Sequence, residues 1–145
     1  MKKIITLILS LTYLQCDKFY DLEIHNNTDK TINIYFADGE TYYPDTLLPQ
    51  TNKRLKETKL NKTHYETSMV QWGEILKKLP KDTLSIFIFS SDTLNKYSWE
   101  EVRRDYKILK RYDLSIQDLE LLDYKVYYPP TPAMSQMKMY PKYGR

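Results

Sequence analysis

Leu84-Ser85-Ile86-Phe87-Ile88-Phe89 is apolar at every position except Ser85. A half-buried strand alternates apolar and polar residues, whereas a strand that is covered on both faces is apolar almost throughout. Six residues is an ordinary length for a strand. The stretch therefore predicts an inner strand of a sheet, with other parts of the chain packed on both of its faces.

Two stretches that precede this strand alternate regularly and predict half-buried strands. In residues 19–25 every second side chain is apolar, and in residues 31–37 Ile32, Ile34 and Phe36 share one face. Residues 26–30 are Asn-, Asp- and Thr-rich and predict the turn between them. Asp38-Gly39 then precedes Thr41-Tyr42-Tyr43, which predicts a hairpin whose second strand begins near residue 41.

The remaining elements complete the predicted fold. Residues 51–60, 63–70 and 124–128 predict further strands, the first two at an edge. Helical spacing that stops at Pro80 predicts a helix over 72–79. A capping box formed by Ser98 and Glu101 predicts a helix over 98–110, and Ser115 with Asp118 predicts another that runs to about residue 122. Together these elements predict an α+β fold: one domain with a mainly antiparallel sheet and two to three helices packed on it.

Four segments are expected along the chain. Residues 1–15 have the pattern of a signal peptide, residues 16–18 form a short tether, and residues 19–130 form the globular domain. Residues 131–145 are rich in Pro, Met and Tyr. This tail is apolar enough that we expect it to pack on the domain rather than to extend into solvent.

Charge and composition exclude several classes of function. The chain has 22 basic and 19 acidic residues and a net charge of +3, and two of the lysines lie in the leader. Near-neutral charge with interleaved signs argues against binding of nucleic acid. Three glycines in the whole chain exclude a glycine-rich phosphate loop.

The leader resembles a bacterial lipoprotein signal. Lys2 and Lys3 precede an apolar run over residues 4–14, and the single cysteine of the chain, Cys16, follows. This run is too short to span a bilayer. The resemblance implies cleavage before Cys16 and attachment of acyl chains such as palmitate to it. Gln15, where a small residue is usual, and Tyr13, where leucine is preferred, depart from the family pattern. An ordinary signal peptide with an incidental cysteine is the alternative.

A second resemblance covers about a third of the chain. SSDTLNKYSWEEVRRDYKILKRYDLSIQDL, from residue 90, and the closing YPP and MKMYPKYG segments are similar to a family of small exported lipoproteins of Bacteroidota. The resemblance implies a place in the cell envelope, membrane-anchored by an N-terminal lipid and facing the periplasm or the cell surface. It implies no activity and no catalytic residue.

The tripeptide Asp-Thr-Leu occurs three times, at residues 45–47, 82–84 and 92–94. It resembles the acceptor of the general O-glycosylation system of the same phylum, which would make Thr46, Thr83 and Thr93 attachment points and the protein a glycoprotein. The alternative is structural, because Asp-Thr is a suitable junction between a turn and a strand that begins at the following Leu. Both interpretations remain open at this stage.

Catalytic patterns are not found in the sequence. His25 and His64 lack the local spacing of metal ligands, and no GxSxG elbow is present. Cys16 is no nucleophile if it is acylated. Asp38, Glu40 and Asp45 are acidic residues of predicted loops, where carboxylates are ordinarily solvated. We therefore expect no enzyme, no cofactor and no metal.

A binding or structural module on the envelope is the function that remains, and two versions compete. One is a protein-interaction subunit that uses the tyrosine-rich hairpin or the Met/Tyr tail, because Tyr and Met are enriched at interfaces. The other binds a saccharide on tyrosine rings. The chain has 14 tyrosines, and the expected ligand contacts are Tyr42, Tyr43, Tyr127 and Tyr128.

Overall fold

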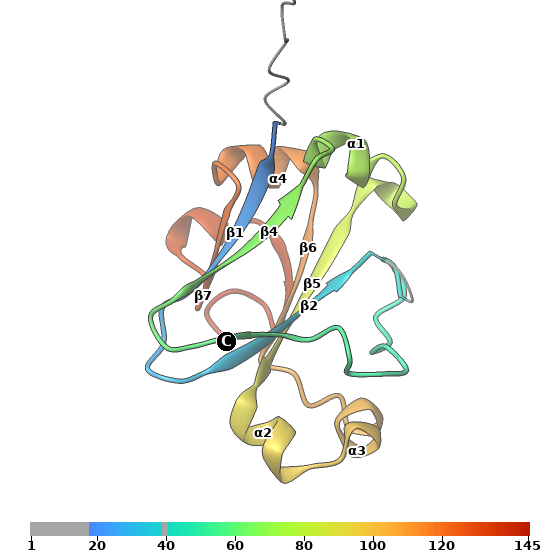
Figure 1. Ribbon diagram of the computed structural model, residues 1–145, viewed down its shortest axis with the longest axis vertical. Coiled ribbons are helices and arrows are strands. Elements are labelled where there is room, and N and C mark those ends of the chain that lie inside the picture. The colour runs from blue at the N-terminus through green and yellow to red at the C-terminus, as the bar shows by residue number, and fades with distance from the viewer. Residues whose placement is uncertain (1–17, 39–40) are drawn as a thin grey trace, which may run out of the picture.

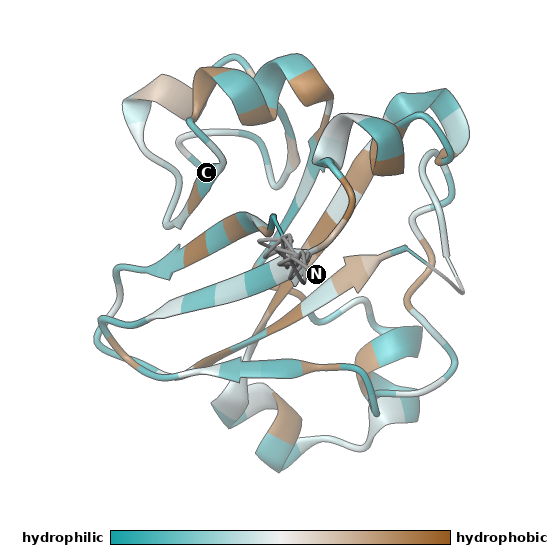
Figure 2. Ribbon diagram, turned by 45° about the horizontal axis from the view of Figure 1, so that its top comes forward, coloured by the Kyte–Doolittle hydropathy of each residue, from teal (hydrophilic) through white to brown (hydrophobic). Residues whose placement is uncertain are grey.

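The apolar stretch forms the inner strand β5 (Leu84–Ser90), which pairs antiparallel with β2 (Ile32–Ala37) on one side and β6 (Lys110–Leu114) on the other. Every side chain from Ile86 to Phe89 is 0% exposed, and most of β5 is coloured as hydrophobic in Figure 2. The prediction of an inner strand covered on both faces is confirmed.

The structure is a computed structural model that describes residues 18–38 and 41–145. These residues form a single α+β domain, in which the strands make two sheets rather than one (Figure 1). The five-stranded sheet has the order β3-β2-β5-β6-β8 and is antiparallel throughout; the three-stranded sheet has the order β4-β1-β7, with β1 antiparallel to β4 and parallel to β7. Their other strands are β1 (Tyr20–Asn26), β3 (Lys56–Thr58), β4 (Thr63–Ser68), β7 (Lys125–Tyr128) and β8 (Lys138–Tyr140).

The main core lies between the two sheets. Alternation in β1 directs Leu22 and Ile24 to one side, where they join Ile86 and Ile88 of β5. Two short helices, α1 (Trp72–Leu76) and α4 (Ile116–Leu121), close one end of this core. The predicted helix over 72–79 is therefore shorter than expected, and a 3₁₀ turn over Pro80–Asp82 follows it.

A second core covers the opposite face of the five-stranded sheet. Phe87 and Phe89 of β5 pack there with Val102 of α3 (Trp99–Arg104). A helix that the sequence pattern did not predict, α2 (Ser91–Lys96), precedes α3 and contributes Leu94 to the same cluster. The described residues thus contain four α-helices instead of two to three.

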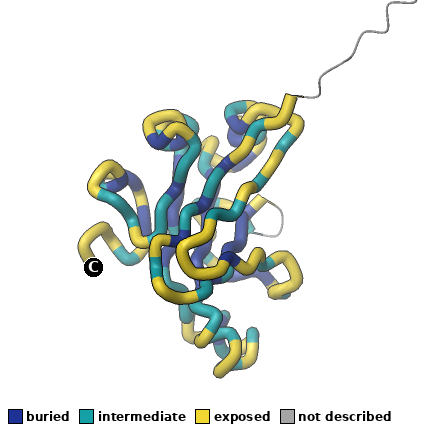
Figure 3. The backbone as a smooth tube through the Cα atoms, turned by 60° about the vertical axis from the view of Figure 1, so that its left-hand side comes forward, coloured by how far each residue is buried: buried dark blue, intermediate teal, exposed yellow. Residues whose placement is uncertain are grey.

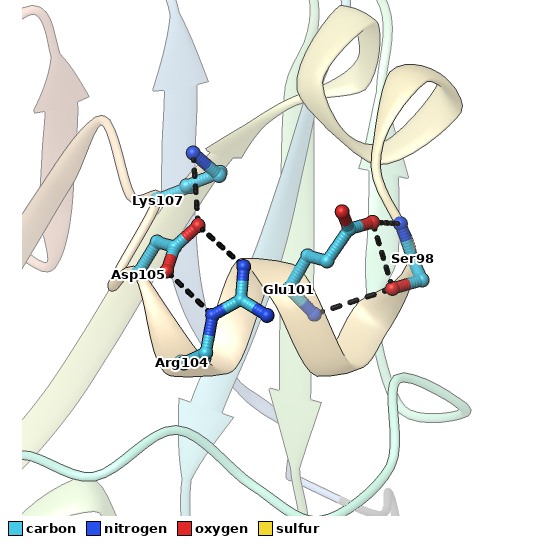
Figure 4. Close-up of polar contacts among 5 residues, drawn as sticks. All are labelled: Ser98, Glu101, Arg104, Asp105 and Lys107. Carbon is cyan, nitrogen blue, oxygen red and sulfur yellow. Dashed lines mark hydrogen bonds and ion pairs between the residues drawn. The ribbon is translucent and has the colours of Figure 1, made fainter.

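Helix α3 begins at the predicted capping box but ends early. Ser98 accepts from the backbone N–H of Glu101, whose carboxylate accepts from the N–H of Ser98 at 2.9 Å (Figure 4). The helix ends at Arg104 because Tyr106 adopts a left-handed backbone, with φ 50°, and the N–H of Lys107 donates to the carbonyl of Val102. The predicted extent of 98–110 is therefore wrong, and the chain turns into β6.

The hairpin predicted around Asp38-Gly39 is also not formed as expected. Residues 41–43 are not part of a strand, while Gly39 and Glu40 lie outside the described residues. β2 instead pairs with β3, which falls within the predicted 51–60 stretch, and with β5. The Asp38 carboxylate forms an ion pair with Arg54.

The tail after residue 130 is part of the fold. Met134, Met137 and Met139 are buried in the main core, and β8 forms an edge of the five-stranded sheet by pairing with β6. Lys110 of β6 is buried and donates from Nζ to the carbonyl oxygen of Pro141 at 2.9 Å. Burial lowers the pKa of this lysine.

Candidate functional site

The three-stranded sheet buries one face and leaves the other open to solvent. Along β1, buried residues alternate with Asp21, Glu23 and His25, which are exposed or half-buried, and Figure 3 shows this alternation along the strands. Residues that are paired across strands direct their side chains to the same side of a sheet. The open face is therefore defined by Asp21, Glu23, His25, Thr63, Tyr65, Thr67, Lys125 and Tyr127.

His25 is the centre of this face. Its Nε2 lies 2.7 Å from Glu23 Oε2, and its Nδ1 lies 3.0 Å from the hydroxyl oxygen of Thr63. A neutral ring with its proton on Nε2 fits both contacts, because it donates to Glu23 and accepts from Thr63. On its flat side the imidazole stacks on Tyr127, with ring centroids 4.7 Å apart. These contacts from three strands fix the orientation of the ring.

Two tyrosines lie on either side of Glu23 and His25. Tyr65 is on β4 opposite Glu23 and is 57% exposed, and Tyr127 is on β7 opposite His25 and half-buried. The open face thus presents aromatic rings on its outer strands and a carboxylate–imidazole pair on its middle strand. A second carboxylate, that of Asp21, accepts from the hydroxyl of Thr67 at 2.6 Å.

Carboxylates and hydroxyls on this face can exchange hydrogen bonds with a polar ligand, while the rings offer flat apolar surface. The arrangement suits a ligand with many hydroxyl groups and an apolar side.

A second histidine–glutamate pair lies on the inner side of the same sheet. His64 Nε2 is 2.9 Å from Glu66 Oε2, and the imidazole packs near Phe36 of β2 at a centroid distance of 5.9 Å. The hydrogen bond from His64 lowers the pKa of Glu66, and partial burial opposes this effect. The pair is a structural link between β4 and the main core.

The structure separates Tyr127 from Tyr128, which the sequence analysis had grouped. Successive strand residues point to opposite faces. Both rings touch the main core, but Tyr128 lies on the same side of the strand as buried Val126, whereas Tyr127 stacks on His25. Burial raises the pKa of Tyr128. Tyr127 alone of this pair belongs to the open face.

Tyr42 and Tyr43 lie elsewhere, in the loop after β2. The Tyr42 hydroxyl donates to the carbonyl of Asp38 at 3.5 Å. The Tyr43 ring has the ammonium group of Lys138 at 4.6 Å from its centroid, and that group also donates to its hydroxyl. Within residues 18–38 and 41–145, no ring contact joins this pair to Tyr127 or Tyr128. The four expected ligand contacts therefore do not form one site.

The three Asp-Thr-Leu threonines have different surroundings. Thr46 is half-exposed in a loop, next to Leu47, which is 66% exposed. Thr83 directly precedes β5 and donates from its hydroxyl to the carbonyl of Lys81 at 2.7 Å. Thr93 lies within α2, and no strand begins at Leu47, so the expectation that a strand begins after each motif holds only at Thr83. Cys16, the expected lipid attachment point, lies outside the described residues.

A second aromatic cluster was not expected from the sequence. Tyr140 of β8 is opposite Arg111 of β6, whose guanidinium lies 5.6 Å from the Tyr140 ring centroid and donates to the hydroxyl of Tyr106 at 2.6 Å. Arg111 also forms a 3.1 Å ion pair with buried Asp113, which accepts from Ser85. The charge of Arg111 is balanced by Asp113. The contact between Arg111 and Tyr140 joins the edge strand β8 to β6.

The pair at the centre of the open face could have been found from the sequence. Glu23 and His25 are two residues apart in a strand, so their side chains lie on one face and within reach of each other. Tyr65 has no local signal, because its place beside Glu23 depends on the pairing of β1 with β4.

Among the residues that the structure describes, no group of three or more His, Cys, Asp or Glu side chains is arranged to hold a metal ion. Nor is any helix in that part of the chain both long and apolar enough to cross a membrane. Comparisons of the chain with protein-family models, curated proteins and solved structures found no match.

Proposed function

We propose that this protein is an envelope lipoprotein, anchored through Cys16, whose domain is a non-enzymatic binding module for a saccharide. The observation that supports the ligand class is the open face of the three-stranded sheet. There, Tyr65 and Tyr127 lie on either side of the hydrogen-bonded pair of Glu23 and His25.

Saccharides have the two properties that this face matches. The C–H groups on one side of a pyranose ring pack against aromatic rings, and its hydroxyls bond to carboxylates. Tyr65 supplies the more exposed ring, and Glu23, which is half-buried, supplies the carboxylate beside it. The contacts that hold His25 and Tyr127 in place reduce the conformational entropy that is lost when a ligand binds.

The character of the face favours a saccharide over a protein partner. The buried centre of a protein–protein interface is depleted in charged residues, whereas the open face has Asp21 and Glu23 on its middle strand and Lys125 on β7. Aromatic rings separated by carboxylates are better suited to a narrow, hydroxylated chain than to an apolar protein surface.

A direct binding screen tests the ligand class. Purified protein is applied to immobilised saccharides that represent bacterial envelope and host glycans. Tyr65→Ser should lower the affinity for any bound glycan by about tenfold, because loss of one stacking contact costs about 1 kcal/mol or more. Tyr143→Ser removes a tyrosine that is 38% exposed outside the open face and is the matched control. Equal loss in both variants, or binding of no saccharide, would contradict the proposal.

The anchor is tested separately. Metabolic labelling with a fatty-acid analogue should mark the wild type, and Cys16→Ser should abolish the label and move the protein from the membrane to the soluble fraction. An unlabelled wild type would contradict lipid attachment and would leave the saccharide proposal intact, because the open face does not include Cys16.

A further inference from the structure

Exposed apolar side chains gather at the end of the domain where the chain enters β1. In the described part of the chain, six large non-tyrosine hydrophobics are exposed, and four of them are Phe19, Met69, Val70 and Leu121, between 46% and 73% exposed. The other two, Leu47 and Leu60, lie in separate loops. We call the four residues the entry-end patch.

Strand pairing brings Phe19 and Met69 to one end, and a cleft lined by Phe19 extends to α4, the helix that carries Leu121. Tyr20 of β1 pairs with Ser68 of β4. Phe19, which precedes Tyr20, and Met69, which follows Ser68, therefore lie at the same end of the β1–β4 pair. Phe19 also lines a cleft of about 490 Å³ with Glu120, the neighbour of Leu121 in α4. Figure 1 places the start of β1, α1 and α4 at one end of the molecule, with α2 and α3 at the opposite end.

Chain length limits how far this end can be from an anchor on Cys16. Three peptide units separate Cys16 from Phe19, and an extended chain spans at most about 3.6 Å per residue, or roughly 11 Å in total. That distance is small compared with the polar headgroup region of a bilayer. A lipid-anchored domain with so short a tether must have its entry end at the membrane surface.

We infer that the entry-end patch contacts the lipid bilayer, with Phe19, Met69, Val70 and Leu121 inserted among the headgroups. This inference rests on the proposed lipid anchor. Exposed apolar groups next to a lipidated residue gain from burial at the interface, and an anchor combined with a second membrane contact holds more firmly than either alone.

Membrane contact at this end also orients the proposed ligand site. β1 begins at the patch and runs away from it, so the open face extends outward from the membrane, with Asp21 nearest the bilayer and His25 farther from it. The α2–α3 end faces away from the membrane. A saccharide would then reach the open face from the side of the domain.

The experiment measures the membrane depth of two positions in the full chain, exported and lipidated. Cys16 is the only cysteine, so once it is acylated a cysteine introduced by Leu121→Cys is the only free thiol for a fluorescent probe. Leu60→Cys is the matched control, because Leu60 is an exposed leucine that precedes β4 at the opposite end of that strand. Each labelled protein is reconstituted into phosphatidylglycerol and phosphatidylethanolamine vesicles that contain brominated lipid.

Brominated lipid should quench the probe at position 121 severalfold more than the probe at position 60. Adding Met69→Gln and Val70→Gln should reduce the quenching at position 121. Equal quenching at both positions would overturn the inference. So would a probe at position 121 that is shielded from aqueous iodide but is not quenched by brominated lipid, because a different occupant would then cover this end. If Cys16 is not acylated, its thiol is labelled as well, and each chain then has two labelled thiols instead of one. This result tests the anchor separately from the membrane contact.

Discussion

His25 and Tyr127 stack across β1 and β7, with ring centroids 4.7 Å apart and ring planes inclined by 22°. The contact depends on the parallel pairing of a strand from the start of the domain with one from near its end. Because Glu23 and Thr63 hold the two nitrogens of the same imidazole, the ring that Tyr127 packs on is fixed from three directions. The site is therefore formed only when the whole three-stranded sheet is assembled.

Trp99→Ala tests the second core. The indole is half-buried, makes an edge-to-face contact with Phe89 at 5.5 Å and donates from Nε1 to the carbonyl of Pro49 at 3.1 Å. We expect the free energy of unfolding to fall by about 2–4 kcal/mol in chemical denaturation, near the lower end for large core truncations. Glu100→Ala, at an exposed position of the same helix, should change it by less than about 0.5 kcal/mol.

Glu66 gives the domain a stability that depends on pH. Its pKa in the folded protein lies below the ordinary value of 4.5, chiefly because His64 donates to it. A carboxyl group with a lowered pKa stabilises the fold fully above its unfolded value, and the stabilisation is lost as the pH falls through the folded value. His64→Ala should raise the pKa of Glu66, as followed by NMR titration, and weaken this dependence. An unchanged pKa would show that His64 is not the cause.

Arg111 and Asp113 test the buried ion pair on β6, the strand next to the sheet edge. The Asp113 side chain is 1% exposed, so Arg111→Met leaves a buried carboxylate with Ser85 as its remaining partner. We expect a loss of about 3–5 kcal/mol in the free energy of unfolding. Combining Arg111→Met with Asp113→Asn should cost less than Arg111→Met alone, and a larger loss in the double variant would show that the charges are not coupled.

Glycosylation at Asp-Thr-Leu should follow the local structure around each threonine, because all three are partly exposed. Thr46 lies in an open loop, whereas the hydroxyl of Thr83 is already bonded to a carbonyl and Thr93 lies within a helix. Exported through a host with the O-glycosylation system, the protein should be heavier than its polypeptide and lipid, and Thr46→Ala should remove most of the added mass. Equal intact masses for the wild type and the triple Thr→Ala variant would show that the motifs are turn and helix junctions only.

Local patterns predicted the elements that depend on local chemistry. Alternation identified β1, because a strand buried on one face has an apolar residue at every second position. The uniform apolar run identified β5, because a strand buried on both faces is apolar almost throughout. The capping box at Ser98 likewise marked the start of α3. The end of that helix was missed because Tyr106 takes the left-handed position that glycine usually occupies, and β6 was lost with it.

The candidate site could likewise be predicted only in part from the sequence. The i, i+2 spacing of Glu23 and His25 is visible in the sequence, but the positions of Tyr65 and Tyr127 beside them depend on strand order, which local patterns do not contain. Grouping Tyr127 with Tyr128 failed because neighbours in a strand face opposite sides.

Capture from native membranes tests the central claim most directly. Wild-type protein and a Tyr65→Ser, Glu23→Gln double variant are immobilised and incubated with solubilised envelope material, and the bound material is analysed by carbohydrate composition and by mass spectrometry. The account predicts that the wild type retains a saccharide, which the double variant loses while it keeps its fold by circular dichroism. Retention of the same material by both proteins, or of a protein partner without carbohydrate, would contradict a saccharide site on the open face.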